Sequence, residues 1–266
     1  MTQLFGLRKP TLILDEEKAK LNLSYIQNKI NQQHIDFRPH FKTHQSAEIG
    51  NWFREAGINK ITVSSIDMAR YFAQNGWNDI FVAFPVNILQ VEEIVELSNQ
   101  IHLSLLFEEL NTVSTIDSFL SEKVSGWIKI DTGANRCGVK EYQFEEILAL
   151  AETIRKSNHL QLKGLVTHAG HSYRYKGKDQ IQDIYDQSIT ILKNIQTKLM
   201  NKGFNSIQIS VGDTPTARLV DNYLSIDELR PGNFLFYDVQ QYQADVCNLD
   251  EIAVALACPV VAIHPA

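Results

Sequence analysis

Short apolar runs alternate with amphipathic stretches along most of this chain, and turn-forming residues separate them. Apolar runs of about four to eight residues are typical of buried strands, whereas apolar positions three and four apart indicate helices. The first pair is a strand at Thr11–Leu14 and a helix at 16–32 that Asp15 can cap. Further strands are predicted to end near Lys42 and to cover 60–63, 79–84, 101–106, 126–130, 162–167 and 207–211, with helices at 46–56, 66–74, 88–98, 108–120, 143–155 and 180–200.

This alternation predicts an α/β fold, a (β/α)8 TIM-type barrel. The strand that leads to Lys42 is the first of seven, and 225–229 is a candidate eighth. The length of 266 residues suits such a barrel, which typically has about 250. The strand at Thr11–Leu14 is then left over. A doubly wound open sheet is the alternative, but no GxGxxG motif follows the first strand.

Composition excludes some partners. Hydrophobic residues make up 44% and charged residues 21% of the chain, and a formal charge of −6 gives no basic face, so no nucleic acid partner is expected. No apolar stretch approaches the length of a membrane span, which argues against a membrane partner. Cys137, Cys247 and Cys258 lack CxxC spacing and are interpreted as reduced thiols of a cytoplasmic protein.

The chemistry is predicted around Lys42 in the stretch RPHFKTH, residues 38–44. Lys42 is predicted at the carboxyl end of a strand, with Arg38, His40 and His44 as cationic neighbours. Their charges would lower its pKa, so that a fraction of the lysine is the neutral amine that a carbonyl cofactor needs. The alternative is a surface lysine after an edge strand.

Four other polar clusters follow or end predicted strands, at 131–138, 167–173, 211–216 and 228–233. In a barrel, such positions collect ligand chemistry. The cluster at 211–216 has the small residues and hydroxyls that cradle a phosphate, although it also reads as a simple turn. Arg136 could hold an anionic oxygen or be a solvated charge. His168 and His171 are acid/base candidates or structural residues, and their spacing is not that of a helical metal site.

The stretches RPHFKTHQS, KIDTGANRCGV, THAGHSY, SVGDTPTA and ELRPGNFLFYD, in this order, resemble the D-threonine aldolase and D-serine dehydratase group of fold-type III pyridoxal-phosphate enzymes, whose barrel is that of the alanine racemase N-terminal domain. The resemblance implies that Lys42 forms the Schiff base with pyridoxal 5′-phosphate and that Arg136 approaches the cofactor ring oxygen. It implies catalytic roles for His168 and Tyr173 on the substrate side, with Tyr173 also near the cofactor. The phosphate would be held by Gly212, Asp213, Thr214, Gly232 and Asn233. Phe234 stands where relatives usually have tyrosine.

The implied activity is that of a lyase that cleaves or dehydrates small D-β-hydroxy amino acids, as a homodimer. Lys42 would take the Cα proton. An amino-acid racemase and a non-catalytic cofactor carrier remain alternatives.

The resemblance also implies a domain division. Residues 16–233 would form the cofactor-binding barrel, and 1–15 and 234–266 would be strands of an incomplete C-terminal β domain, because the apolar run 252–263 resembles the opening strand of such a domain. Metal-dependent relatives carry an HxC or HxD motif there. His264 is followed by Pro265 and Ala266, so we expect no metal ligands in this chain, and Zn or Mn only in a longer form.

Overall fold

The computed structural model describes residues 6–223 and 225–264, and strands alternate with helices through these ranges as predicted. The chain begins with β1 (Thr11–Leu14) and α1 (Glu16–Asn31). Asp15 caps α1 by accepting a hydrogen bond from the N–H of Lys18. The buried face of α1 carries Ala19, Leu23, Ile26 and Ile30. Their spacing places them on one side of the helix, which packs on the barrel.

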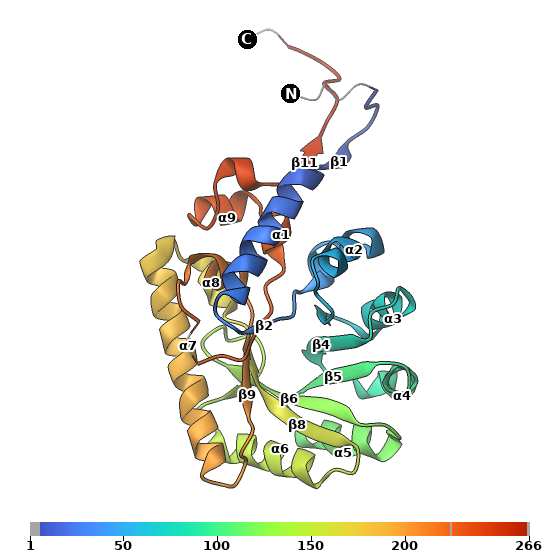
Figure 1. The fold of residues 1–266 in the computed structure, drawn as a ribbon, viewed down its shortest axis with the longest axis vertical. Coiled ribbons are helices and arrows are strands. Elements are labelled where there is room, and N and C mark those ends of the chain that lie inside the picture. The colour runs from blue at the N-terminus through green and yellow to red at the C-terminus, as the bar shows by residue number, and fades with distance from the viewer. Residues whose placement is uncertain (1–5, 224, 265–266) are drawn as a thin grey trace.

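Eight strands within the described ranges form the barrel wall, and every neighbouring pair along their path is parallel. Their order in space is β2, β10, β9, β8, β6, β5, β4, β3, and a short β7 (Val139–Lys140) pairs with the end of β6 (Figure 1). The wall strands are β2 (Asp36–Phe37), β3 (Ile61–Val63), β4 (Asp79–Pro85), β5 (His102–Phe107), β6 (Val124–Asp131), β8 (Leu160–Thr167), β9 (Gln208–Val211) and β10 (Glu228–Leu229).

The two ends of this strand order meet next to Lys42. After β2 the chain continues to His40, which forms an isolated parallel bridge with Thr62 of β3. The N–H of Thr62 donates to the carbonyl oxygen of Pro39 at 2.9 Å, and the Thr62 hydroxyl donates to that of Arg38 at 3.0 Å. These contacts join the segment after β2 to β3 and so link the two ends of the strand order. The predicted barrel is confirmed.

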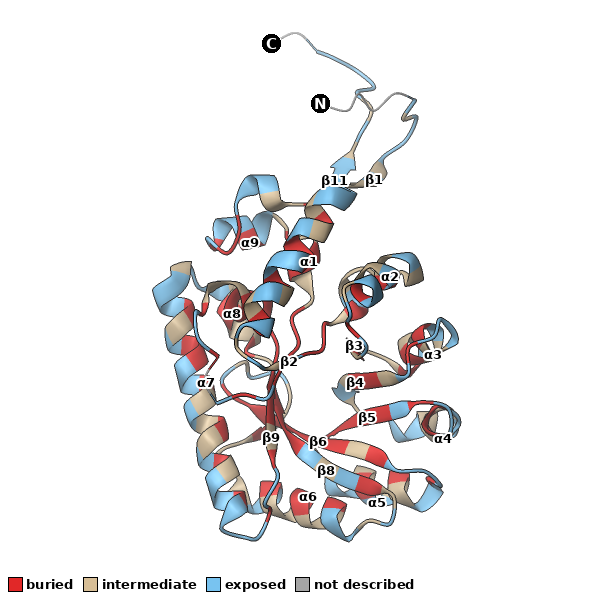
Figure 2. Ribbon diagram, in the orientation of Figure 1, coloured by how far each residue is buried: buried red, intermediate tan, exposed pale blue. Residues whose placement is uncertain are grey.

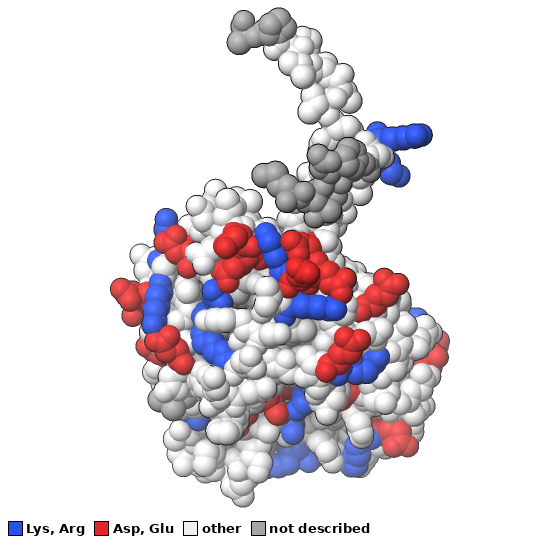
Figure 3. All heavy atoms as spheres, turned by 45° about the horizontal axis from the view of Figure 1, so that its top comes forward, with Lys and Arg blue, Asp and Glu red and all other residues white. Residues whose placement is uncertain are grey.

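Helices lie outside the strands, and Figure 2 shows their buried residues turned toward the sheet. Besides α1 they are α2 (Ala47–Glu55), α3 (Ile66–Gln74), α4 (Val91–Ser98), α5 (Leu110–Phe119), α6 (Phe144–Lys156), α7 (Gly177–Met200), α8 (Thr214–Leu219) and α9 (Val239–Gln243). Short 3-10 turns are η1 (Phe41–Thr43), η2 (Ile88–Gln90), η3 (Gly170–Arg174), η4 (Asn233–Leu235) and η5 (Leu249–Glu251). No helix in the two described ranges is long and apolar enough to cross a membrane. Acidic and basic side chains are interspersed on the face shown in Figure 3.

Three details differ from the predicted elements. Lys42 lies in η1 rather than at a strand end, because β2 stops at Phe37 and the His40 side chain caps the turn. The predicted helix at 88–98 begins as the separate turn η2. The pattern also does not predict two helices: α8 begins in the cluster 211–216, expected to be a phosphate loop or a simple turn, and α9 lies in the segment 234–266, expected to form strands. Each has only one or two turns and is marked mainly by an aspartate cap.

Side chains fill the barrel interior. Phe81, Leu106, Trp127 and Val166 form an apolar cluster separate from the main core between strands and helices. The rings of Phe81 and Trp127 stack with centroids 5.6 Å apart. The barrel is therefore a packed support for the loops at its end, not a pore.

Outside the barrel, β1 pairs with β11 (Val254–Ala257) as an antiparallel ribbon, with Leu12 opposite Leu256 (Figure 1). The sequence predicted both strands and their association, although β11 is shorter than the apolar run 252–263. Phe234 and Leu235 are buried in the main core, so this core extends past the predicted boundary at 233. Residues 1–5, 265 and 266 of the predicted flanking segments lie outside the described residues. The assignment of the ribbon to a second domain stays a prediction.

Candidate active site

A cavity of about 470 Å³ opens at the carboxyl ends of the barrel strands, where the polar clusters were predicted to gather. Segments at the ends of β2, β6, β8, β9 and β10 form its polar wall, and the ends of β4 and β5 form an apolar wall. Predicted site residues that line this site cavity are Lys42, Arg136, His168, Tyr173, Gly212, Asp213, Gly232 and Asn233. Thr214, the remaining one, is fully buried directly after Asp213.

Lys42 enters the site cavity from η1. The N–H of Lys42 donates to Nδ1 of His40 at 3.3 Å, which fixes the turn that presents the side chain. Burial lowers the pKa of the Lys42 amine from its ordinary value, and the positive charges of Arg136 and Arg230 lower it further. The neutral amine is the nucleophilic form, so this environment favours attack on a carbonyl carbon.

The cations that act on Lys42 are not all those expected from its sequence neighbours. Arg38 is buried and ion-paired, with Nε 2.6 Å from Glu228 and Nη1 2.5 Å from Asp79. The ring of His44 packs on Phe41, with centroids 4.4 Å apart. The expectation that Arg38 perturbs Lys42 is therefore wrong, because its charge is matched by two carboxylates.

Gly212 and Gly232 allow two loops to approach the lysine turn and each other. A Cβ on Gly232 would lie 2.8 Å from the carbonyl oxygen of His40, and a Cβ on Gly212 would lie 2.9 Å from that of Arg230. Only glycine fits this close backbone packing. Asn233 continues the second loop, and its Nδ2 donates to Asp238 at 2.9 Å.

The Asp213 side chain belongs to the framework of its loop. Its carboxylate accepts hydrogen bonds from the N–H of Thr216 at 2.8 Å and from the hydroxyl of Ser172 at 3.0 Å. Burial raises its pKa to about 6. The hydroxyls of Thr214 and Thr216 are buried near Tyr173 and Asp213 without a direct hydrogen bond of good geometry in the described chain. Both remain available to an anion.

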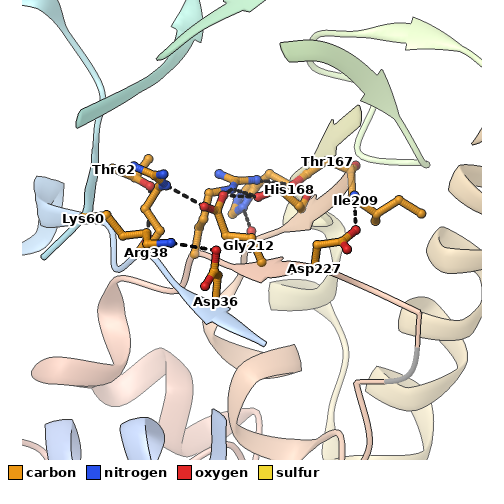
Figure 4. Close-up of polar contacts among 12 residues, drawn as sticks. Asp36, Arg38, Lys60, Thr62, Thr167, His168, Ile209, Gly212 and Asp227 are labelled. Atoms are coloured by element: carbon orange, nitrogen blue, oxygen red, sulfur yellow. Dashed lines mark hydrogen bonds and ion pairs between the residues drawn. The ribbon is translucent and has the colours of Figure 1, made fainter. Parts of the chain in front are cut away.

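His168 lies at the end of β8, and its Nδ1 contacts the carbonyl oxygen of Gly212 (Figure 4). A carbonyl only accepts, so Nδ1 carries the proton and Nε2 is an acceptor. Burial and the positive charges of Lys129 and Lys42 lower the pKa of His168 to about 3. His168 is therefore a neutral hydrogen-bonding group at neutral pH and a weak base.

Tyr173 lies in η3, which follows β8, and its hydroxyl reaches the loop after β9. Its hydroxyl oxygen accepts a hydrogen bond from the N–H of Thr214 at 3.1 Å. Burial, with the negative charge of Asp213, raises its pKa to about 12. The phenol of Tyr173 is therefore protonated at neutral pH and is not a base there.

Arg136 is carried by the loop after β6. Asp131 holds this loop by accepting from the N–H groups of Gly133 and Asn135, at 2.9 and 3.1 Å, and by pairing with Lys140 at 2.9 Å. Together these contacts bring Arg136 to the site cavity wall, as the motif predicts.

Two charged residues that line the cavity, Lys129 and Arg230, were not predicted as site residues. Lys129 is 6% exposed on β6, and burial lowers its pKa to about 7. Arg230 donates to Ser210 Oγ at 2.6 Å and to the carbonyl oxygen of Thr167 at 2.8 Å, and burial lowers its pKa to about 10. The sequence feature that could have identified Lys129 as a site residue is its position as a lysine inside an apolar strand. Among the described residues, no three His, Cys, Asp or Glu side chains gather as metal ligands would.

Comparisons with known proteins agree with this arrangement. Residues 14–239 match the family model of the alanine racemase N-terminal domain. The chain is 27% identical to a D-serine dehydratase from Dictyostelium discoideum, over 98% of this chain and 70% of the relative. It is 27% identical to D-threo-3-hydroxyaspartate dehydratase from Delftia sp., over 97% of this chain and 69% of the relative. The structure of that enzyme superposes with a TM-score of 0.89, covering 94% of this chain and 67% of the other. Identity to a D-threonine aldolase from Arthrobacter sp. is 23%, over 86% of this chain and 61% of the relative.

Proposed function

The chain belongs to the alanine racemase N-terminal domain family, and we propose that it is a pyridoxal-phosphate-dependent lyase acting on D-β-hydroxy amino acids. Its relatives are fold-type III pyridoxal-phosphate enzymes, both dehydratases and an aldolase, that act on D-hydroxy amino acids. The family thereby supports the class of reaction, and the residues of the site cavity are the basis for assigning roles.

One observation carries the proposal, the position of Lys42 opposite two glycine loops in a single cavity. Pyridoxal phosphate needs an amine for its aldehyde and donors for its phosphate. Lys42 has a lowered pKa, and the buried hydroxyls of Thr214 and Thr216 lack good direct partners. Gly212 and Gly232 allow their loops to pack closely against Arg230 and the lysine turn, which brings the backbone of both loops to the cavity. These residues fit the cofactor.

Lys42 is proposed to hold the cofactor and then to take the Cα proton of the substrate at Nζ. The bound cofactor supplies an electron sink for the charge left at Cα. Arg136 and Arg230 act on the amine by keeping its pKa low, which leaves Nζ free to accept the proton.

The other predicted residues are proposed to bind and orient. Arg136 would bind an anionic oxygen of the cofactor or substrate. His168, with its proton on Nδ1, presents a neutral ring to the site cavity. Gly212, Thr214, Gly232 and Asn233 would hold the phosphate with Tyr173, whereas the Asp213 carboxylate braces the loop, because a negative charge facing phosphate would repel it.

Loss of water is proposed as the main reaction, because the relatives aligned over nearly the whole chain are dehydratases. The test loads the chain with pyridoxal phosphate, adds D-serine or D-threonine, and identifies products. A 2-oxoacid with ammonia supports the dehydratase, and glycine with an aldehyde indicates the aldolase. Inverted substrate alone would indicate a racemase, and no product with cofactor bound would indicate a carrier.

We also propose a homodimer, as the family resemblance implies, and a cytoplasmic location, as the unpaired cysteines suggest. Light scattering after size-exclusion chromatography measures the first, and cell fractionation the second. A variant of D-threo-3-hydroxyaspartate dehydratase is known in a metal-free form. Assays with added Zn²⁺ or Mn²⁺, and with chelator, measure any metal requirement here.

A further inference from the structure

Strand β4 is irregular where it meets the site cavity. Val82 pairs with Leu105 and Pro85 pairs with Leu106, so two extra residues, Ala83 and Phe84, lie between these pairs on β4. Such bulges redirect side chains and are common beside active sites. The 58% exposed Phe84 lines the site cavity together with Pro85. The bulge therefore shapes the apolar wall opposite the polar loops.

A second cavity of about 230 Å³ lies next to this wall. It shares Ser64, Phe84 and Pro85 with the site cavity, so the two spaces adjoin at these residues. We call it the annex. Its apolar lining includes four buried side chains, Ile66, Val82, Ile94 and Leu105.

Two of the four polar side chains that line the annex accept hydrogen bonds from the backbone. The hydroxyl of Ser65 accepts from the N–H of Met68 at 3.1 Å, and Oδ1 of Asn87 accepts from that of Leu89 at 3.1 Å. No ionisable residue is among the described residues that line the annex. A carboxylate there would lose its hydration without gaining a cation, whereas an alkyl group would lose only contact with water.

We propose that the annex binds the β-substituent of the substrate and favours a branched alkyl group over a carboxylate. The inference rests on the proposed function and specifies its substrate class as D-3-hydroxy amino acids of the hydroxyleucine type. The size is sufficient, since an aliphatic cavity of about 150 Å³ accommodates benzene. The side chain would pass Phe84 to reach the annex, which makes this bulge residue part of the specificity wall.

Two pairs of ligands test the preference on the chain loaded with pyridoxal phosphate. D-Leucine carries an isopropyl group on Cβ where D-aspartate carries a carboxylate. Both lack the β-hydroxyl that the reaction would remove, so their binding can be measured from the cofactor absorbance without turnover. D-3-Hydroxyleucine and D-3-hydroxyaspartate make the same comparison in turnover. We expect D-leucine to bind about tenfold more tightly than D-aspartate. Equal binding, or tighter binding of D-aspartate, overturns the inference.

Variants at the annex provide a second measurement. Val86→Trp fills the annex from its half-buried edge and should weaken D-leucine about tenfold while D-alanine changes less than about twofold. Leu89→Trp is the matched control, because this 87% exposed side chain lies in the same segment outside the annex lining. Gln90→Arg adds a cation to the lining and should shift preference toward D-aspartate.

The outcomes separate the two proposals. If Val86→Trp and Leu89→Trp lose D-leucine affinity equally while the D-alanine response stays normal, that result contradicts only the inference that the annex binds the β-substituent. No absorbance response to any D-amino acid, D-alanine included, contradicts the proposed function and the annex together.

Discussion

The hydroxyl oxygen of Tyr173 accepts a hydrogen bond from the backbone N–H of Thr214, with 3.1 Å between the two atoms. Tyr173 follows β8 and Thr214 follows β9, so this bond joins the loops of neighbouring strands. This hydrogen bond fixes the backbone of Thr214. It does not involve the Thr214 hydroxyl, which can therefore bind a ligand. Contacts within the chain thus order the two loops that we propose to face the phosphate.

Thr214→Val tests the hydroxyl. Valine keeps the shape and the backbone bond to Tyr173, so the stability of the cofactor-free chain should change by less than about 1 kcal/mol. Affinity for pyridoxal phosphate should fall by about 1–3 kcal/mol, because a hydrogen bond to a charged group is lost. Fluorescence titration and urea unfolding measure the two. Thr62→Val is the control, since its buried hydroxyl donates to Arg38 and its loss should lower stability instead. Unchanged cofactor affinity would place the phosphate elsewhere.

Lys42→Ala should abolish covalent cofactor binding. No amine would replace Nζ in the turn, so the yellow absorbance should disappear on dialysis and turnover should fall by at least about 10²–10⁴. Borohydride reduction followed by peptide mapping identifies the modified residue in the parent chain. Lys163→Ala, at an exposed position on β8, is the control and should stay yellow. Labelling of Lys129 instead of Lys42 would refute the assignment.

Arg136→Gln should shift the pH dependence of cofactor attachment upward. The charge of Arg136 helps lower the pKa of Lys42, so its removal raises that pKa and leaves less neutral amine at a given pH. Stopped-flow absorbance across a pH series measures the attachment rate. Arg174→Gln, an exposed change on η3, should leave the profile in place. A profile that moves downward would mean that Arg136 does not act through its charge on Lys42.

Lys129→Met should stabilise the cofactor-free chain at neutral and lower pH. Folding lowers the pKa of Lys129 from 10.5 to about 7. Below pH 7 both states are protonated and the buried ammonium carries its full cost, which declines as pH rises from 7 toward 10.5. The free energy of unfolding of the variant should therefore exceed that of the parent by roughly a few kcal/mol at pH 6, and by less at pH 9. Urea unfolding measures this, with Lys163→Met as the control for loss of a lysine. A gain independent of pH would show that Lys129 is not buried as an amine.

The sequence by itself determined the barrel and most of the site. Apolar runs alternating with amphipathic stretches allow few arrangements other than parallel strands covered by helices, and polar clusters that follow strands must meet at one end. This pattern alone predicts that Lys42, Arg136, His168 and Gly212 meet around one cavity, as they do. The motif resemblance supplied the chemistry that periodicity lacks.

Only the tertiary structure decided how individual side chains act. Arg38 stands four residues from Lys42 but is neutralised by Glu228 and Asp79, whereas Arg230 is 188 residues away and lowers the pKa of the lysine. Likewise, the annex depends on the β4 bulge, which is defined by its register against β5. The reason is physical. Charge, burial and side-chain direction depend on strand register and on partners remote in sequence, and a local pattern does not contain these distances.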